Sequence, residues 1–212
     1  VKKIKLSLMA DYQNFETYLF LKPNKFIISV ISDTNDKIFE KVSSFETNMS
    51  DIDLDKLDSF LNDNIFDIEK ILNNFVKNIN LFIDSEIFSS IEMSIKKNNY
   101  GELITNDNLN HILSEAKDQC SDTLKDKKLS HILINNYFID DNKYSNLPHN
   151  IKCNHFSLDI TFICLPLDYY RNLIKILSNY QISLDRLVSL RYMKNFFSQE
   201  KIDLNEMARK II

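Results

Sequence analysis

Cys153 and His155 are the residues whose types and spacing come closest to a chemical site in this sequence. A thiolate and an imidazole can bind a metal ion together, and residues i and i+2 of a strand share one face. His149 is the one further ligand close in sequence, and no C-x-x-C or H-x-x-x-H spacing occurs. We therefore interpret Cys153 and His155 as structural, and we predict no metal site and no catalytic pair.

Two pairs of acidic residues are the next candidates, Asp140 with Asp141 and Asp33 with Asp36. Both pairs fall in predicted turns, where aspartate is favoured because its side chain hydrogen-bonds the turn backbone. No base or nucleophile can be assigned as a partner to either pair, as a hydrolase would require. The sequence therefore predicts a protein that is not an enzyme.

Gly101 is the single glycine in 212 residues, whereas glycine makes up about 7% of ordinary proteins. Loops that cradle phosphate groups use several glycines, because the backbone must approach the phosphate closely and adopt positive φ. One glycine cannot supply a Walker loop or a dinucleotide-binding fingerprint. We expect no nucleotide and no other cofactor to bind.

The composition bounds the class of protein further. The formal net charge is −4 with both signs mixed throughout, so electrostatic support for nucleic-acid binding is weak. Three irregularly spaced cysteines indicate a reduced, cytoplasmic protein, and Cys120 and Cys164 lie on apolar faces, which favours a core role. Residues 1–10 lack a long apolar run, so we expect no signal peptide. No segment reaches the roughly 20 apolar residues of a membrane span.

The elements of the first part of the chain are a β-meander and a long helix. Strands are expected at residues 18–21, 26–31 and 37–42, separated by turns. A helix capped by Ser50 or Asp51 is expected over residues 53–78, because apolar residues recur three and four positions apart. This stripe consists of Leu54, Leu57, Leu61, Ile65, Ile68, Leu72, Phe75 and Ile79, widened by Phe60 and Ile71. Short strands at 81–83 and across Ile91, Met93 and Ile95 follow.

Residues 102–188 form a predicted α+β unit. Thr105 can cap a helix, two strands follow at 129–139 and 155–165, and a helix over 166–180 leads to a closing strand at 182–188. Further helices are expected at 191–197 and at 204–212, the latter begun by Asp203 with Glu206 at capping-box spacing. With seams near 84–90 and 190, the expected domains are residues 15–88, 89–190 and a helical tail over 191–212.

This order of elements resembles the N-terminal half of the bacterial cell-division family FtsA, whose members are actin-like. Residues 104–107 resemble the family's I-T-x-x-D entry to an inserted helix, with Asp107 one place early. Residues 131–140 resemble its I-L-H … y-x-v-D strand, 148–156 keep the spacing of its P-x-G-M-x-G-x-x-L segment, and 180–184 resemble its g-l-x-v exit. Asn150 and Cys153 replace the two glycines, and asparagine can hold positive φ at modest cost. The resemblance implies the fold class: α/β, an actin-like (ribonuclease H-like) half domain with an inserted α+β subdomain.

The turn at residues 22–25 departs from that family. Its first nucleotide loop lies at this turn and contains an acid and a glycine, both missing here, while Pro23 removes a backbone donor. We therefore expect no ATP binding by these 212 residues. Two alternatives stay open: an actin-like ATPase whose remaining loops lie beyond residue 212, and a pilus-assembly scaffold of the similarly built PilM family.

The resemblance implies a non-catalytic cell-division scaffold in the cytoplasm, peripheral at the inner face of the cell membrane. Its partners would be division proteins such as an FtsZ-type filament, with self-association as a further option. The contact residues expected near the tip of the inserted unit are Tyr137, Tyr144, Leu147 and Pro148. The alternative is that these four are ordinary loop residues that pack on the nearest sheet. The final helix, with Leu204, Met207, Ala208 and Ile211 on one face, resembles the family's membrane-binding end, although so short a stripe more often packs on its own domain.

Overall fold

The chain folds as two compact units in a computed structural model that describes residues 14–47, 50–148, 150–197 and 203–211. Unit 1 contains the described residues up to Glu86 and from Arg171 onward, and unit 2 contains Ile87–Tyr170. The predicted inserted domain, residues 89–190, starts close to the beginning of unit 2 but extends well past its end.

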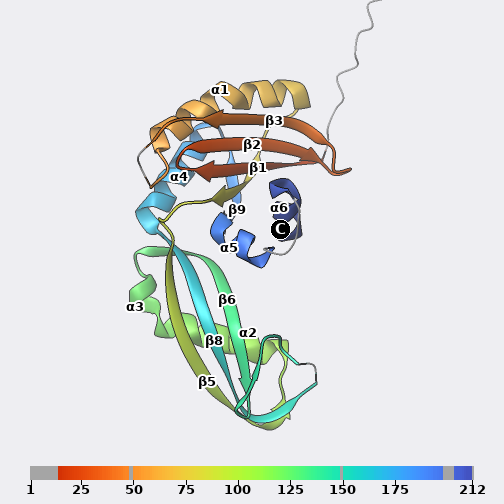
Figure 1. Ribbon diagram of the computed structural model, residues 1–212, viewed down its shortest axis with the longest axis vertical. Helices are drawn as coiled ribbons and strands as arrows, with labels where there is room; N and C mark the ends of the chain where they lie inside the picture. The colour runs from red at the N-terminus through yellow and green to blue at the C-terminus, as the bar shows by residue number, and fades with distance from the viewer. Residues whose placement is uncertain (1–13, 48–49, 149, 198–202, 212) are drawn as a thin grey trace, which may run out of the picture. The chain divides into compact units, whose positions relative to one another are not determined.

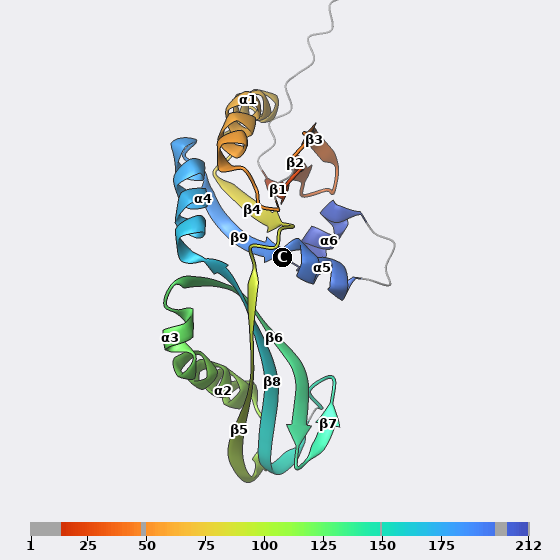
Figure 2. The same ribbon diagram turned by 60° about the vertical axis from the view of Figure 1, so that its left-hand side comes forward.

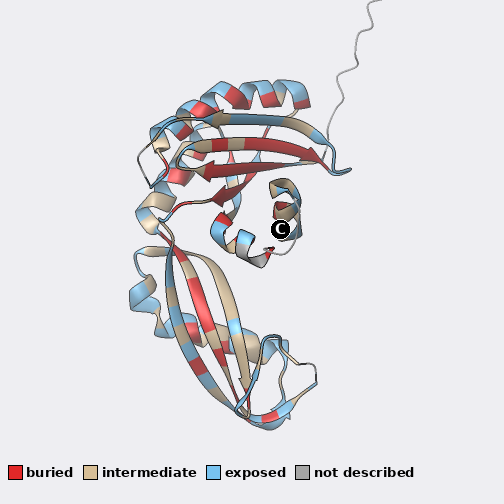
Figure 3. Cartoon of the chain, in the orientation of Figure 1, coloured by how far each residue is buried: buried red, intermediate tan, exposed pale blue. Residues whose placement is uncertain are grey.

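Unit 1 is built on a five-stranded sheet in the order β3-β2-β1-β4-β9. β1 (Phe15–Lys22), β2 (Lys25–Ser32) and β3 (Lys37–Ser44) form the antiparallel meander that the sequence predicts. β4 (Asn78–Ile83) and β9 (Ser183–Ser189) run parallel to β1. Consecutive residues of β1 and β2 are buried (Figure 3), so both faces of this sheet must be covered.

Helices cover the two faces of the unit 1 sheet (Figure 1, Figure 2). α1 (Leu54–Leu72) and α4 (Leu167–Asn179) lie on one face, where the rings of Phe26 and Phe60 meet at 5.8 Å. α5 (Leu190–Phe196) and α6 (Leu204–Ile211) lie on the other face. There they pack on an aromatic cluster in which the Phe20 and Phe82 rings are 4.9 Å apart. Each face therefore has an apolar core of its own.

The apolar face of α6 belongs to that second core. Ala208 is fully buried, and Leu204, Met207 and Ile211 pack on the cluster that contains Phe20 and Phe82. Asp203 Oδ1 accepts a hydrogen bond from the Glu206 amide at 2.9 Å, so the predicted start of this helix is confirmed. The residues that resemble a membrane-binding stripe thus pack on their own unit. Within the described ranges, no helix has both the length and the apolar character that crossing a membrane requires.

α1 starts and ends at positions that differ from the prediction. Its cap is Asp53, whose carboxylate accepts hydrogen bonds from the amides of Asp55 and Lys56, and neither Ser50 nor Asp51 holds this position. Its end is Asn73, which takes a left-handed conformation with φ of 50°. The helix therefore ends six residues before Ile79, the last residue of the predicted apolar stripe. Phe75 is 71% exposed and Ile71 is 45% exposed, so these two residues of the predicted apolar stripe do not belong to the core.

Unit 2 is an antiparallel sheet in the order β5-β8-β6-β7, covered on one face by helices (Figure 1). Its strands are β5 (Ser89–Leu103), β6 (Lys127–Ile139), β7 (Asn142–Tyr144) and β8 (Lys152–Pro166), and its helices are α2 (Asn106–Gln119) and α3 (Ser121–Leu124). Alternate residues of β8 form the core with Ile112 and Ala116 of α2. Thr105 caps α2 in a capping box with Asn108, as its type predicts.

β9 is a correction to the predicted unit. The sequence places this strand as the last element of the inserted domain, but it pairs with β4 in the sheet of unit 1. Parallel neighbours need a long crossover connection, and here unit 2 together with α4 provides it. The strand pattern was visible in the sequence, whereas its pairing partner, about 100 residues away, was not.

Candidate interaction site

Five residues with positive φ gather at one end of the unit 2 sheet, and we call this end the tip of unit 2. They are Tyr100 (φ 51°), Gly101 (79°), Asp140 (44°), Asp141 (68°) and Asn150 (55°). Strand register brings them together, because Asn98 pairs with His155 and Ile139 pairs with Phe156. Non-glycine residues in this region are uncommon, and such strain concentrates at functional sites. The tip is therefore the first candidate for a site.

Asp140 organises the tip. Its carboxylate accepts hydrogen bonds from the backbone amide of Asn154 at 3.0 and 3.2 Å and from that of His155 at 3.0 Å. The His155 ring lies between two carboxylates, with Nδ1 3.4 Å from Asp140 and Nε2 3.3 Å from Asp141. Asp140 and Asp141 occupy the two-residue turn between β6 and β7, as their sequence predicts. These contacts fix the turn onto β8 and leave the Asp141 side chain 88% exposed.

Tyr100 is the most exposed large apolar side chain of the described chain, at 83%. It lies in a bulge of β5. Asn98 pairs with His155 and Glu102 pairs with Cys153, so an advance of four residues on β5 corresponds to two residues on β8. The buried Asn99 side chain holds the bulge by donating to the Glu102 carbonyl at 2.6 Å. Gly101 is needed there for its backbone, since a Cβ would meet nothing nearer than 3.9 Å but would be strained at φ 79°. The bulge therefore presents an aromatic ring to solvent.

The predicted contact residues lie on β6, on β7 and in the loop that follows, in a more protected setting than Tyr100. Tyr137 and Tyr144 are directly opposite each other on β6 and β7, and both pack, half-buried, on the core of unit 2. Leu147 and Pro148 are half-buried in the following loop. The structure thus brings the two tyrosines together, and binding of a partner by these four residues stays a prediction. Sequence reasoning missed Tyr100, although an aromatic residue beside the single glycine was a usable signal.

Cys153 and His155 do not form a shared site. Cys153 lies in the core of unit 2, where burial and then the charge of Asp140 raise the pKa of its thiol. His155 instead faces the two aspartates of the turn. His149 lies outside the described residues, and the described ones contain no cluster of three metal ligands. Burial also raises the pKa of Cys164, so neither thiol is activated as a nucleophile.

The carboxyl ends of β1, β4 and β9 are the place where a parallel sheet usually presents a ligand. Here Asp84, which follows β4, lies 3.6 Å from Lys22 Nζ at the end of β1 and 2.6 Å from Lys194 Nζ on α5. Burial alone would raise the pKa of Asp84, but its hydrogen bond with Lys194 and the charges of both lysines lower it. Pro23 and Asn24 close the adjacent turn. The two cations at this edge are thus already paired with a carboxylate.

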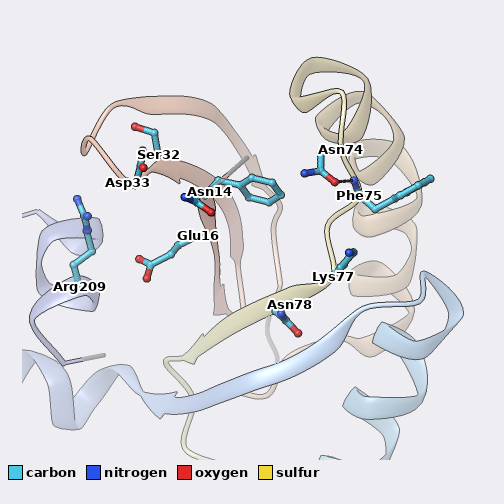
Figure 4. Close-up of a pocket in the computed structure, with 10 residues that line it drawn as sticks. Asn14, Glu16, Ser32, Asp33, Asn74, Phe75, Lys77, Asn78 and Arg209 are labelled. Atoms are coloured by element: carbon cyan, nitrogen blue, oxygen red, sulfur yellow. Dashed lines mark hydrogen bonds between the residues drawn. The ribbon is translucent and has the colours of Figure 1, made fainter. Parts of the chain in front are cut away.

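A hollow of about 480 Å³ lies near the start of β1 and β4 in unit 1 (Figure 4). Its wall carries Glu16 and Asp33 as well as Lys77 and Arg209, and the Arg209 guanidinium donates to the Asn35 side chain. In Figure 4 the charged side chains are spread around the hollow and do not converge on one point. Ser32 also lines the hollow, and its hydroxyl oxygen is 2.8 Å from that of Thr34 and accepts a hydrogen bond from the Asp36 amide at 2.9 Å.

Solved structures match this chain, whereas the comparisons with family models and curated sequences give no match. One matching structure is a chain of the PilM–PilN type IV pilus biogenesis complex. It has a TM-score of 0.53 and 5% identity, and the match covers 88% of this chain and 50% of that one. The cytoplasmic domain of EpsL, an inner-membrane component of the type II secretion system of Vibrio cholerae, matches with a TM-score of 0.38 and 12% identity, over 83% and 56%.

A third match is a protein of Bacteroides thetaiotaomicron described as having an actin-like ATPase fold and unknown function. Its TM-score is 0.35 at 17% identity, over 90% of this chain and 58% of that one. This chain therefore spans between half and three fifths of the structures that it matches. The sheet order, the separate unit between β4 and β9 and the likeness to the pilus-complex chain confirm the predicted fold class, an α/β chain of the actin-like type. They do not single out the FtsA family.

Proposed function

We propose that this chain is a non-catalytic scaffold of a bacterial membrane-associated assembly, acting in the cytoplasm through protein–protein contacts. The observation that carries the proposal is the Lys22–Asp84–Lys194 cluster, which occupies the sheet edge where the resemblance would put a nucleotide. A phosphate group binding there would have to compete with a carboxylate for both ammonium groups. Without a glycine loop beside it, this edge is suited to holding β1, β4 and α5 together.

A pilus or secretion assembly is the better supported setting. The structural likeness with the highest TM-score given above is to a chain of the PilM–PilN type IV pilus biogenesis complex. The cell-division reading, with an FtsZ-type partner, is supported by the short sequence motifs alone. We therefore rank a PilM-type scaffold first and an FtsA-type scaffold second.

The tip of unit 2 is our proposed contact surface. Tyr100 offers a large, exposed aromatic ring, and aromatic anchors dominate binding energy in protein interfaces. Asp141 adds an exposed charge at the same end of the sheet. The strained turns are fixed by Asp140 and Asn99, so little order has to be gained on binding. Tyr144 on β7 and Leu147 in the loop after it are half-buried and would extend the contact surface.

The test is a two-part binding experiment with purified chain. Immobilised wild-type chain is offered a PilN-type cytoplasmic peptide and, separately, an FtsZ-type filament, and the Tyr100→Ser variant is compared with Phe66→Ser. Phe66 is an exposed aromatic residue of α1 (71%), so it controls for loss of an exposed ring. We expect binding of the pilus-type peptide, weakened about tenfold or more by Tyr100→Ser only. Binding of neither partner would refute the scaffold proposal.

The non-catalytic part is tested by calorimetric titration with Mg-ATP. We expect no binding heat from the wild-type chain, and a Lys194→Met variant should behave alike. An actin-like ATPase with further loops beyond residue 212 is the competing function. Binding of ATP at micromolar affinity by the chain, or by a longer gene product that contains it, would favour that alternative.

A further inference from the structure

A groove of about 510 Å³ runs between β3 and α1 in unit 1, and we call it the α1–β3 groove. Its floor is aromatic, with Phe26, Phe45 and Phe60 in contact: the Phe26 ring is 4.8 Å from Phe45 and 5.8 Å from Phe60. Lys41 and Ser43 of β3 form one wall, and polar residues of α1 form the other. The function proposed above makes no use of this groove.

β3 is an edge strand whose outer backbone groups are open to pairing. It ends the sheet order, so β2 is its one strand neighbour among the described elements. The Phe45 amide donates to the Asn24 carbonyl at 3.0 Å, and antiparallel bonding alternates from there. Ser43 and Lys41 therefore bond to β2, while the N–H and C=O groups of Ser44 and Val42 point outward. Both of these residues are exposed.

The helix wall of the groove is acidic. Asp55, Asp63 and Asp67 follow one another at multiples of four along α1, so they line one side of the helix together with Ser59. Asp55 suits the positive start of the helix, but Asp63 and Asp67 have no such reason and repel each other at i, i+4. None of the three forms an ion pair within the described residues. Including Asp53, four carboxylates face Lys41 and Lys56, which leaves a net charge of −2.

Lys56 shows that the groove can hold a cationic side chain. Its Nζ lies 4.6 Å above the centre of the Phe45 ring and 3.7 Å from the Asp53 carboxylate. This ammonium group thus has an aromatic face on one side and a carboxylate on the other, which is a favourable environment for a cation. Further along the groove, Asp63 and Asp67 offer two carboxylates that form no ion pair within the described residues.

We propose that the α1–β3 groove binds a basic, extended segment of a partner protein, which adds to β3 as a sixth strand of the sheet. Main-chain hydrogen bonds to Val42 and Ser44 would hold the segment, as in other cases of strand addition. Side chains in an added strand alternate, so every second residue lies over the groove, opposite Lys41 and Ser43. Lysine or arginine at these positions reaches Asp63 and Asp67. This surface belongs to unit 1, and its partner is separate from the one proposed for the tip of unit 2.

The test uses a fluorescein-labelled decapeptide of alternating lysine and valine and the full chain, with anisotropy as the readout. We expect saturable binding that weakens as salt is raised, since the charges are exposed. The Asp63→Asn/Asp67→Asn variant should bind at least about tenfold more weakly. Asp118→Asn/Asp122→Asn is the matched control, because it removes two exposed aspartates of unit 2 at the same spacing, and it should bind like wild type. Equal weakening by both variants would overturn the proposal as non-specific attraction.

Strand addition is tested separately from charge. Val42→Pro removes an outward N–H without touching the hydrogen bonds to β2, and it should also weaken binding at least about tenfold. If that variant folds poorly, amide exchange in the wild-type chain decides, since the peptide should protect the Val42 and Ser44 amides. Unprotected amides would overturn the proposal. The proposal would also be overturned if the Lys3→Ser/Lys5→Ser variant bound the peptide and the wild-type chain did not. The groove would then bind the chain's own N-terminal lysines.

Discussion

Replacement of Asp140 by alanine should destabilise the tip of unit 2 by about 3 kcal/mol. Two backbone amides, of Asn154 and His155, lose a charged acceptor, worth about 1 kcal/mol each after allowance for a carboxylate that is 37% exposed. A further cost of about 1 kcal/mol arises because alanine must hold a left-handed φ of 44°. The loss of about 2 kcal/mol from the two hydrogen bonds is what tests whether Asp140 holds the turn.

Asp141→Ala is the matched control for Asp140→Ala. Asp141 also has a left-handed φ (68°), but its side chain is 88% exposed and accepts no backbone hydrogen bond among those described. It should cost about 1 kcal/mol, which leaves about 2 kcal/mol between the two variants for the hydrogen bonds. Asp140→Asn keeps both the tolerance of positive φ and one acceptor oxygen, so it should fall between them.

Amide hydrogen exchange measured by NMR is the direct assay, because it reports the tip separately from the rest of the chain. The Asn154 and His155 amides should exchange about 30-fold faster in Asp140→Ala than in Asp141→Ala, as 2 kcal/mol implies. Amides of β1 and β4, in unit 1, should be unchanged. Equal exchange in the two variants would show that Asp140 does not hold the turn, and the account of a pre-ordered tip would fail with it.

Three further predictions concern helix ends and pH. Asn73→Ala should cost about 1 kcal/mol and Asn73→Gly close to nothing, because the end of α1 needs φ near 50°; equal melting temperatures by circular dichroism would contradict this. Thr105→Ala should cost about 1 kcal/mol through loss of the capping box, whereas Thr105→Ser should keep it, as urea unfolding can show. Burial lowers the pKa of His131 from 6.5 to about 4, so the unfolded chain takes up a proton that the folded chain resists. Stability should therefore fall as pH drops from about 6.5 towards 4, by about 1–2 kcal/mol, and His131→Gln should flatten that slope.

Regular patterns made much of the fold predictable. The meander, the alternation of Phe156, Leu158 and Ile160, and the Thr105 cap all follow from contacts within a few residues, and all are confirmed. The helix end was missed because Phe75 continues the spacing of α1 although Asn73 has already turned the chain. Periodicity counts side chains and is insensitive to one left-handed residue, which decides where the helix stops.

The candidate site was harder to predict, because it depends on strands meeting. Tyr100 and Asp140 are 40 positions apart, and only the register of β5 and β6 on β8 places them at the same end of the sheet. The four predicted contact residues came from the loop that looked most like a tip. Two of them, Tyr137 and Tyr144, have part of their rings in the core, which a loop-based argument cannot foresee.

The order in which the strands of unit 1 leave the ribosome has a consequence for biosynthesis. β4 is made before unit 2, but its neighbour β9 and the helices that cover Phe20 and Phe82 are made after it. During synthesis, therefore, β4 can pair with β1 but is an open edge on its other side, and the aromatic face stays uncovered until residues beyond Arg171 emerge. Unit 2 has all of its own strands by then and can fold first. Such a nascent chain exposes apolar surface for the time needed to translate unit 2, which is the kind of intermediate that chaperones bind.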